Sequence, residues 1–144
     1  MTTVISNELR IQIPASKAAV GAVRDMVAGR LRTWGFPSMI DDIILATGEM
    51  AANAVAVTPF GGHIWVRLSL DPAGVLLEIW DPSEELPART PLIELTLETL
   101  DLSPENFDNN GGRGLAILDT LADAWNVRPH PTGGKIVWSR FTTR

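Results

Sequence analysis

The segment from Asp42 to Val57 constrains the fold most, because it is a helix-length run that is almost free of polar side chains. Apart from Asp42 at its first position, its strongest hydrogen-bonding side chains are Glu49 and Asn53. Residues four apart stand one above the other on a helix, so this carboxylate and carboxamide share one face. An ionised carboxylate in apolar surroundings is costly unless it is paired or meets a cation. The segment alone therefore leaves two interpretations open: an exposed polar stripe on an amphipathic helix, or part of a binding site.

Another helix is predicted upstream, over residues 16–34. Ser16 is placed to cap its first turn, its apolar side chains fall on one stripe, and Gly35 suits a left-handed C-terminal cap. Ser38 lies three residues before Asp41, which is the spacing of a capping box with aspartate in place of the usual glutamate. The sequence therefore predicts that Ser38 caps the helix that follows.

Alternating apolar and polar residues predict strands in the rest of the chain. The strands are expected at residues 9–13, 63–70, 75–81, 125–128 and 135–141. In the third of these, the inward-facing row of apolar side chains ends in Asp81, at a position where a core does not favour a charge. Asp81 is interpreted either as a turn residue before Pro82 or as a functional acid.

These elements predict an α/β fold, a two-layer sandwich in which a mixed, mostly antiparallel sheet carries helices on one face. The length of 144 residues indicates a single domain over residues 1–144. The other face of the sheet would carry aromatic and basic side chains, namely Trp65, Arg67, Trp80, Trp138 and Arg140. Such a face suits the docking of a partner, and it equally suits cross-strand pairs that stabilise a half-exposed sheet.

The composition excludes several classes of function. The net charge is −5 and no basic run is present, which argues against non-specific binding to nucleic acid. The chain has no cysteine, and its two histidines are too far apart in sequence for a metal-binding spacing. Neither a signal peptide nor an apolar run of membrane-spanning length is recognisable, so a cytoplasmic location without membrane association is expected.

The stretch from Pro82 to Asn110 is the least regular part of the sequence, with four prolines and several acidic residues. A short helix over about residues 91–100 is one option, and the length of the connection predicts a functional lid. A glycine-rich turn follows and opens another predicted helix, whose apolar face is Leu115, Leu118, Leu121, Ala122 and Trp125. Backbone amides of such a turn approach anions closely, and the helix N-terminus adds partial positive charge. The turn therefore predicts a phosphate cradle, to which Arg113 adds a guanidinium.

Four motifs in order resemble the ATP-binding domain of the GHKL superfamily. They are E-x-x-x-N-A at Glu49–Ala54, a strand ending in Asp81, GGRGL at Gly111–Leu115, and GGK-I-V-W at Gly133–Trp138. The order and spacing are most similar to those of the stand-alone bacterial anti-sigma-factor serine/threonine kinases. The resemblance covers nearly the whole chain and implies the same α/β sandwich, with ATP and Mg²⁺ as cofactors and residues 82–110 as an ATP lid.

The resemblance also implies a role for each matching residue. Asn53 would coordinate Mg²⁺, a hard cation that prefers oxygen ligands. Asp81 would accept a hydrogen bond from the adenine amino group. Glu49 would be the general base of the phosphoryl transfer. The remaining nucleotide contacts would come from Gly112, Arg113, Gly114 and Leu115.

The implied activity is phosphorylation of a serine or threonine of an anti-sigma-factor antagonist, with a sigma factor held inactive as the second partner. A nucleotide-binding regulatory module that acts by protein contact without kinase activity is the main alternative, and an ATPase that hydrolyses for conformational cycling is a third. Whether two copies form a homodimer is left open. Three departures from the superfamily pattern bear on nucleotide affinity and turnover. No glycines follow Asp81, no basic residue follows Ala54, and Lys135 stands where many relatives place a threonine near the adenine.

Overall fold

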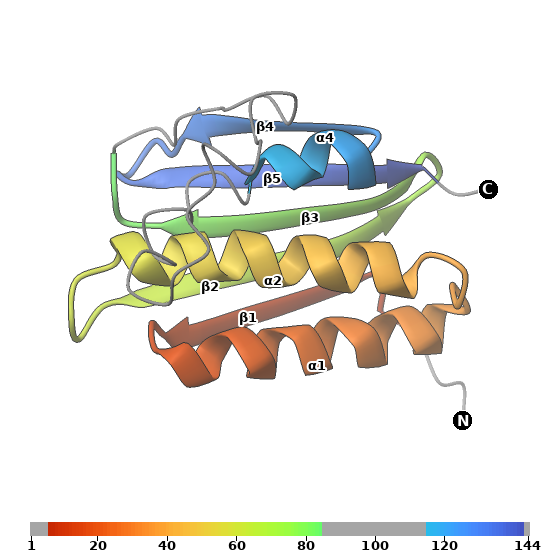
Figure 1. Ribbon diagram of the computed structural model, residues 1–144, viewed down its shortest axis with the longest axis horizontal. Helices are drawn as coiled ribbons and strands as arrows, with labels where there is room; N and C mark the ends of the chain where they lie inside the picture. The colour runs from red at the N-terminus through yellow and green to blue at the C-terminus, as the bar shows by residue number, and fades with distance from the viewer. Residues whose placement is uncertain (1–5, 85–114, 143–144) are drawn as a thin grey trace, which may run out of the picture.

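The structure, a computed structural model, describes residues 6–84 and 115–142 (Figure 1). In chain order its helices and strands are β1 (Glu8–Pro14), α1 (Lys17–Trp34), α2 (Ile40–Val57), β2 (His63–Asp71), β3 (Gly74–Asp81), the 3₁₀ helix η4 (Leu115–Ile117), α4 (Leu118–Leu121), β4 (Ala124–Pro129) and β5 (Lys135–Thr142). None of the helices in these two ranges combines the length and the apolar character needed to cross a membrane.

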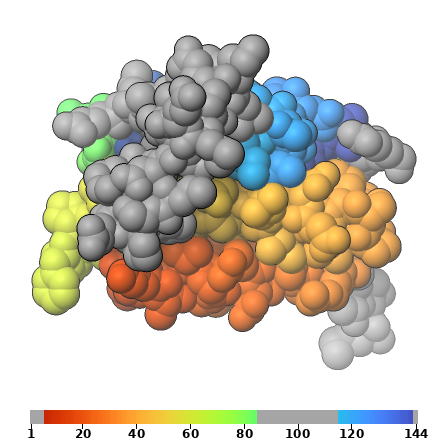
Figure 2. All heavy atoms as spheres, in the orientation of Figure 1, coloured from red at the N-terminus to blue at the C-terminus, as the bar shows by residue number. Residues whose placement is uncertain are grey.

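The strands form one sheet in the order β1-β2-β3-β5-β4, and every neighbouring pair within the described residues is antiparallel. The helices α1, α2 and α4 lie on one face of this sheet (Figure 1). In the space-filling view the side chains of α1 and α2 form one continuous layer (Figure 2). The predicted α/β two-layer sandwich is therefore confirmed.

The ends of α1 are capped as the sequence predicts. The Ser16 side chain accepts a hydrogen bond from the Ala19 amide at 3.3 Å, which satisfies one of the free N–H groups of the first turn. At the other end Gly35 adopts the left-handed conformation with φ 82°, and its amide bonds back to the last turn.

The predicted cap of α2 is wrong. The helix begins at Ile40, and its N-cap residue Met39 is in the right-handed helical conformation without a side-chain hydrogen bond. Ser38 lies inside a preceding turn, in which the Met39 amide donates to the Phe36 carbonyl at 3.3 Å. Asp41 lies in the first turn of the helix instead, where a carboxylate interacts favourably with the helix dipole.

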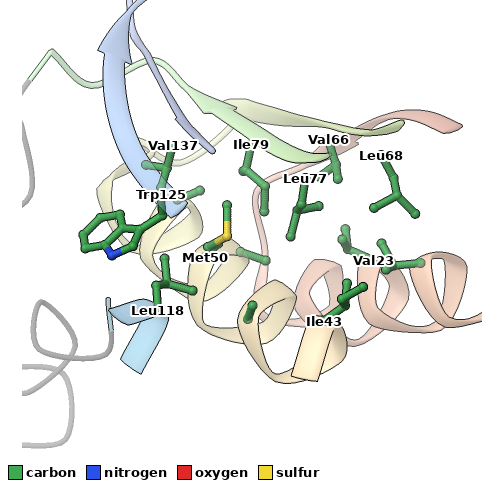
Figure 3. Packing of buried hydrophobic residues seen from close by; sticks show 14 of the residues in the cluster. Val23, Ile43, Met50, Val66, Leu68, Leu77, Ile79, Leu118, Trp125 and Val137 are labelled. Atoms are coloured by element: carbon green, nitrogen blue, oxygen red, sulfur yellow. The ribbon is translucent and has the colours of Figure 1, made fainter. Parts of the chain in front are cut away.

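The core lies between the helices and the inner face of the sheet. Figure 3 shows Met50 of α2 below Ile79 and Val137 of the sheet, with Leu118 of α4 beside it. The buried Ser139 hydroxyl lies 3.3 Å from the Met50 sulfur, so the middle of α2 packs directly on β5. This packing fixes the height of α2 above the sheet and therefore positions the polar residues of that helix.

The helix after the glycine-rich turn is shorter than predicted. It ends at Leu121, because Ala122 adopts an extended conformation with φ −98° and ψ 151°. The chain then enters β4, which contains Trp125. Trp125 is buried in the core as its apolar spacing predicts, but it reaches the core from a strand and not from the helix.

Candidate functional site

Glu49 and Asn53 lie on α2 at the border of its buried face, and both are half-buried. The Asn53 Nδ2 donates to the Glu49 backbone carbonyl at 2.8 Å. Because a carbonyl oxygen only accepts hydrogen bonds, this contact assigns the nitrogen of the amide to the helix side. The Asn53 Oδ1 then faces away from that bond, and it accepts no hydrogen bond from residues 6–84 or 115–142. The orientation suits a cation, because Mg²⁺ takes oxygen ligands.

The Glu49 carboxylate forms no ion pair with any residue of the described ranges. It borders a surface hollow of about 280 Å³ between α1 and α2, which Arg24 and Gly48 also line. The missing side chain of Gly48 makes room for Arg24, whose Cδ lies 3.3 Å from the position that a Cβ would occupy. Within the part of the chain that the structure covers, no three acidic or histidine side chains gather to hold a metal ion.

Asp81 lies at the end of β3, on the inner face of the sheet, as its row predicts. Its side chain is engaged by Lys135, the first residue of β5, which is its partner in the strand register. The Lys135 Nζ donates to Asp81 Oδ1 at 2.8 Å, and the Ser83 amide donates to the same oxygen at 2.9 Å. The pair is desolvated, because Asp81 is 1% exposed and Lys135 is 3% exposed. Burial raises the pKa of Asp81, although Lys135 and the Ser83 amide oppose this shift.

Gly134 closes the same corner of the molecule. Its φ of 79° lies in the left-handed region, and a Cβ built there would lie 2.3 Å from the Asp81 carbonyl oxygen. A glycine is therefore required for the turn before β5 to approach the end of β3 this closely. The turn is also fixed from the outer side, where the Trp80 indole donates to the Gly133 carbonyl at 3.0 Å.

The elements that carry the predicted site residues converge on one side of the sheet. The C-terminal ends of α2 and β3 lie at the same end of the molecule (Figure 1), and the inward row of β3 packs under α2. Leu115 is 1% exposed in the same core cluster as Met50 and Ala54 of α2. The other predicted phosphate contacts, Gly112, Arg113 and Gly114, lie outside the described residues, and so do residues 85–110 of the predicted lid.

On the outer face of the sheet, several of the predicted aromatic and basic side chains make cross-strand contacts. Trp65 stacks on Trp80 with ring centroids 6.4 Å apart and an interplanar angle of 4°. Glu78, which is 2% exposed, pairs with Arg67 at 3.1 Å and also with Arg128. A hollow of about 570 Å³ opens beside these residues. The stabilising cross-strand contacts are thus present, and the docking of a partner on this face stays a prediction.

The model of one protein family matches residues 13–141, which is nearly the whole chain. Its description is the histidine kinase-like ATPase domain. The chain belongs to this family. A search of curated proteins finds no match. The resemblance to a GHKL-type ATP-binding domain is therefore confirmed, and it supports an ATP-binding role for this ATPase domain.

The site residues fit the metal ion of a magnesium nucleotide better than they fit its adenine. Where Mg²⁺ would be expected, the Asn53 amide presents its oxygen, and the Glu49 carboxylate has no ion-pair partner in the described ranges. Where the adenine would be expected, Asp81 is buried, as an acid that hydrogen-bonds to adenine would be. Its charge, however, is already balanced by Lys135. Adenine is therefore not needed to compensate this buried carboxylate.

Lys135 is the site residue whose role sequence reasoning missed. Its departure from the family pattern was visible, but its partner was not. One signal was present: Lys135 heads an alternating row of inward-facing residues in the last strand, just as Asp81 ends such a row in β3. A buried lysine at the edge of a core needs an acid, and the antiparallel register of β3 and β5 supplies it.

Proposed function

We propose that this ATPase domain is an anti-sigma-factor-like protein kinase, which transfers the γ-phosphate of ATP to a serine or threonine of an antagonist protein and holds a sigma factor inactive. The observation that carries this proposal is the pair on α2. Glu49 and Asn53 lie one turn apart, and neither the carboxylate of Glu49 nor the Oδ1 of Asn53 is taken by another described residue. A general base needs a carboxylate that is free to accept a proton, and a metal ligand needs an oxygen that is free to bind the ion.

The chemistry divides between these two residues. Asn53 would hold Mg²⁺ through Oδ1, and the ion would supply positive charge to the phosphate oxygens. Glu49 would take the proton of the substrate hydroxyl while that oxygen forms a bond to the γ-phosphorus. The bond from the γ-phosphorus to its bridging oxygen breaks at the same time, and ADP leaves with the electron pair. Positioning and electrostatics carry most of such a transfer.

Labelled ATP, Mg²⁺ and a candidate antagonist test the kinase activity, with Glu49→Gln as the variant. Glutamine has nearly the same shape but cannot take the proton, so transfer should fall roughly 100-fold or more while ATP still binds. Asp42→Asn is the matched control, because it removes an exposed carboxylate of the same helix. Equal transfer by Glu49→Gln and the wild type would show that Glu49 is not the general base.

The metal role is tested separately by binding. Asn53→Ala removes the oxygen ligand, so the gain in ATP affinity on adding Mg²⁺ should disappear, whereas Asn53→Asp retains an oxygen and should retain a gain. Isothermal titration with and without Mg²⁺ measures both. An undiminished Mg²⁺ effect in Asn53→Ala would show that the ion is held elsewhere.

The alternative function is a nucleotide-binding module that regulates by contact alone. The Asp81–Lys135 pair favours it, because the charge of Asp81 is balanced without any nucleotide. The two functions separate in a reporter assay of sigma-dependent transcription. If Glu49→Gln regulates as the wild type does and no antagonist is ever labelled, contact alone accounts for the regulation. If Glu49→Gln changes sigma-dependent transcription when the antagonist is present but not when the antagonist is absent, the kinase function is supported.

A further inference from the structure

Asp81 and Lys135 form a buried ion pair, so the Asp81 carboxylate does not need a nucleotide base to compensate its burial. A lone carboxylate buried at the end of β3 would be strongly destabilising until a donor reached it. Here the Lys135 ammonium supplies both the opposite charge and a hydrogen bond of 2.8 Å. The carboxylate is therefore balanced within the fold itself, by a residue of the neighbouring strand.

The geometry also limits what Asp81 can offer to a ligand. Its Oδ1 accepts from two donors, Lys135 Nζ and the Ser83 amide at 2.9 Å, so both lone pairs of that oxygen are in use. Its Oδ2 accepts no hydrogen bond from the described residues, but it belongs to a carboxylate whose charge is neutralised 2.8 Å away. A neutral amino group gains much less from such an acceptor than from an unpaired carboxylate, because charge-assisted hydrogen bonds are the stronger ones.

We propose that Lys135 sets the base selectivity of this ATPase domain by holding Asp81 in an internal ion pair, so that nucleoside triphosphates bind with little contribution from the exocyclic amino group of the base. This inference rests on the proposed nucleotide binding and goes beyond it. Lys135 acts here as a specificity-determining residue through Asp81. The ligand class is a nucleoside triphosphate to whose binding the amino group of the base adds little.

Two probes measure the contribution of the amino group: ATP, and purine riboside triphosphate, which lacks that group. The ratio of their dissociation constants is measured by titration with Mg²⁺ for the wild type and for Lys135→Thr, well above the pKa of Asp81. We expect a ratio within about threefold for the wild type and a ratio at least about tenfold larger for Lys135→Thr, as a hydrogen bond to a free carboxylate implies.

Matched variants separate selectivity from charge and folding. Lys17→Thr removes the only other lysine of the chain, which is exposed at the start of α1, and should leave the ratio unchanged. Lys135→Arg keeps a cation beside Asp81 and should behave as the wild type. If circular dichroism shows that Lys135→Thr does not fold, Lys135→Gln takes its place, because it removes the charge and keeps a hydrogen-bond donor.

The outcomes are distinguishable. A wild-type ratio already at about tenfold would overturn the inference, because the amino group would then be read despite Lys135. An unchanged ratio in a folded, nucleotide-binding Lys135→Thr variant would overturn it as well, and the proposed function would stand. Binding of neither probe by the wild type or by any folded variant would refute the proposed function and this inference together.

Discussion

Gly134→Ala tests how closely the turn before β5 must approach the end of β3. The added Cβ would lie 2.3 Å from the Asp81 carbonyl oxygen and 2.7 Å from the Trp80 indole nitrogen. One of these neighbours is backbone, which cannot move aside as the end of a flexible side chain can. The substitution therefore combines a strained left-handed backbone with a clash against β3.

The magnitude follows from comparison with Gly35, which has nearly the same φ, 82° against 79°, and open space where a Cβ would lie. The left-handed conformation alone costs an alanine about 1–2 kcal/mol, and this is the whole effect expected for Gly35→Ala. Forcing an extra carbon into an occupied space adds about 1–3 kcal/mol. We therefore expect Gly134→Ala to lower the free energy of unfolding by about 2–5 kcal/mol in total.

Urea denaturation followed by far-ultraviolet circular dichroism measures both variants. The difference between them isolates the clash, provided that the denaturant slope stays the same. Equal losses in the two variants, within about 0.5 kcal/mol, would show that the turn moves away from Asp81 without cost and would refute the reasoning.

Four further variants test the caps, the core and the response to acid. Ser16→Ala should lower the free energy of unfolding by about 1 kcal/mol, whereas Ser38→Ala should have almost no effect; equal losses would contradict the assigned cap. Leu77→Ala, fully buried in β3, should lose about 2–5 kcal/mol in the same urea assay, and a loss below about 1 kcal/mol would contradict its burial. Burial alone would raise the pKa of Asp71. Hydrogen bonds from Arg140 and from two backbone amides outweigh burial and hold this pKa below its usual value. The stability from Asp71 is therefore present above its unfolded-state pKa and is lost as pH falls through the lower folded-state pKa, so Asp71→Asn should flatten the acid limb of stability against pH; an unchanged limb would contradict this.

Much of the fold could be predicted from the sequence because its signals are local. The alternating rows of β2 and β3 place Val66, Leu77 and Ile79 in the core by their two-residue period alone. The cap at Ser16 and the left-handed Gly35 depend only on a few neighbouring residues. The pairing of Glu49 and Asn53 is likewise a property of one helix.

What could not be predicted depends on the position of distant segments. The partner of Asp81 lies 54 residues away and is set by the register of β3 with β5, which no local pattern contains. Ser38 has the spacing of a capping residue, but the turn that joins the two helices takes it out of the cap position. The helix before β4 stops at Leu121 because the chain must reach the sheet edge, although its apolar period continues.

The alternation of side chains along β3 places Trp80 and Asp81 on opposite faces of the sheet although they are neighbours in the chain. The Trp80 ring is held between two aromatic neighbours, His63 at 5.3 Å and Trp65 at 6.4 Å, and by its hydrogen bond to Gly133. Indole emission is sensitive to such surroundings. The protein thus carries a natural optical probe one peptide bond from its buried carboxylate, and comparison with Trp80→Phe would isolate that signal without any attached dye.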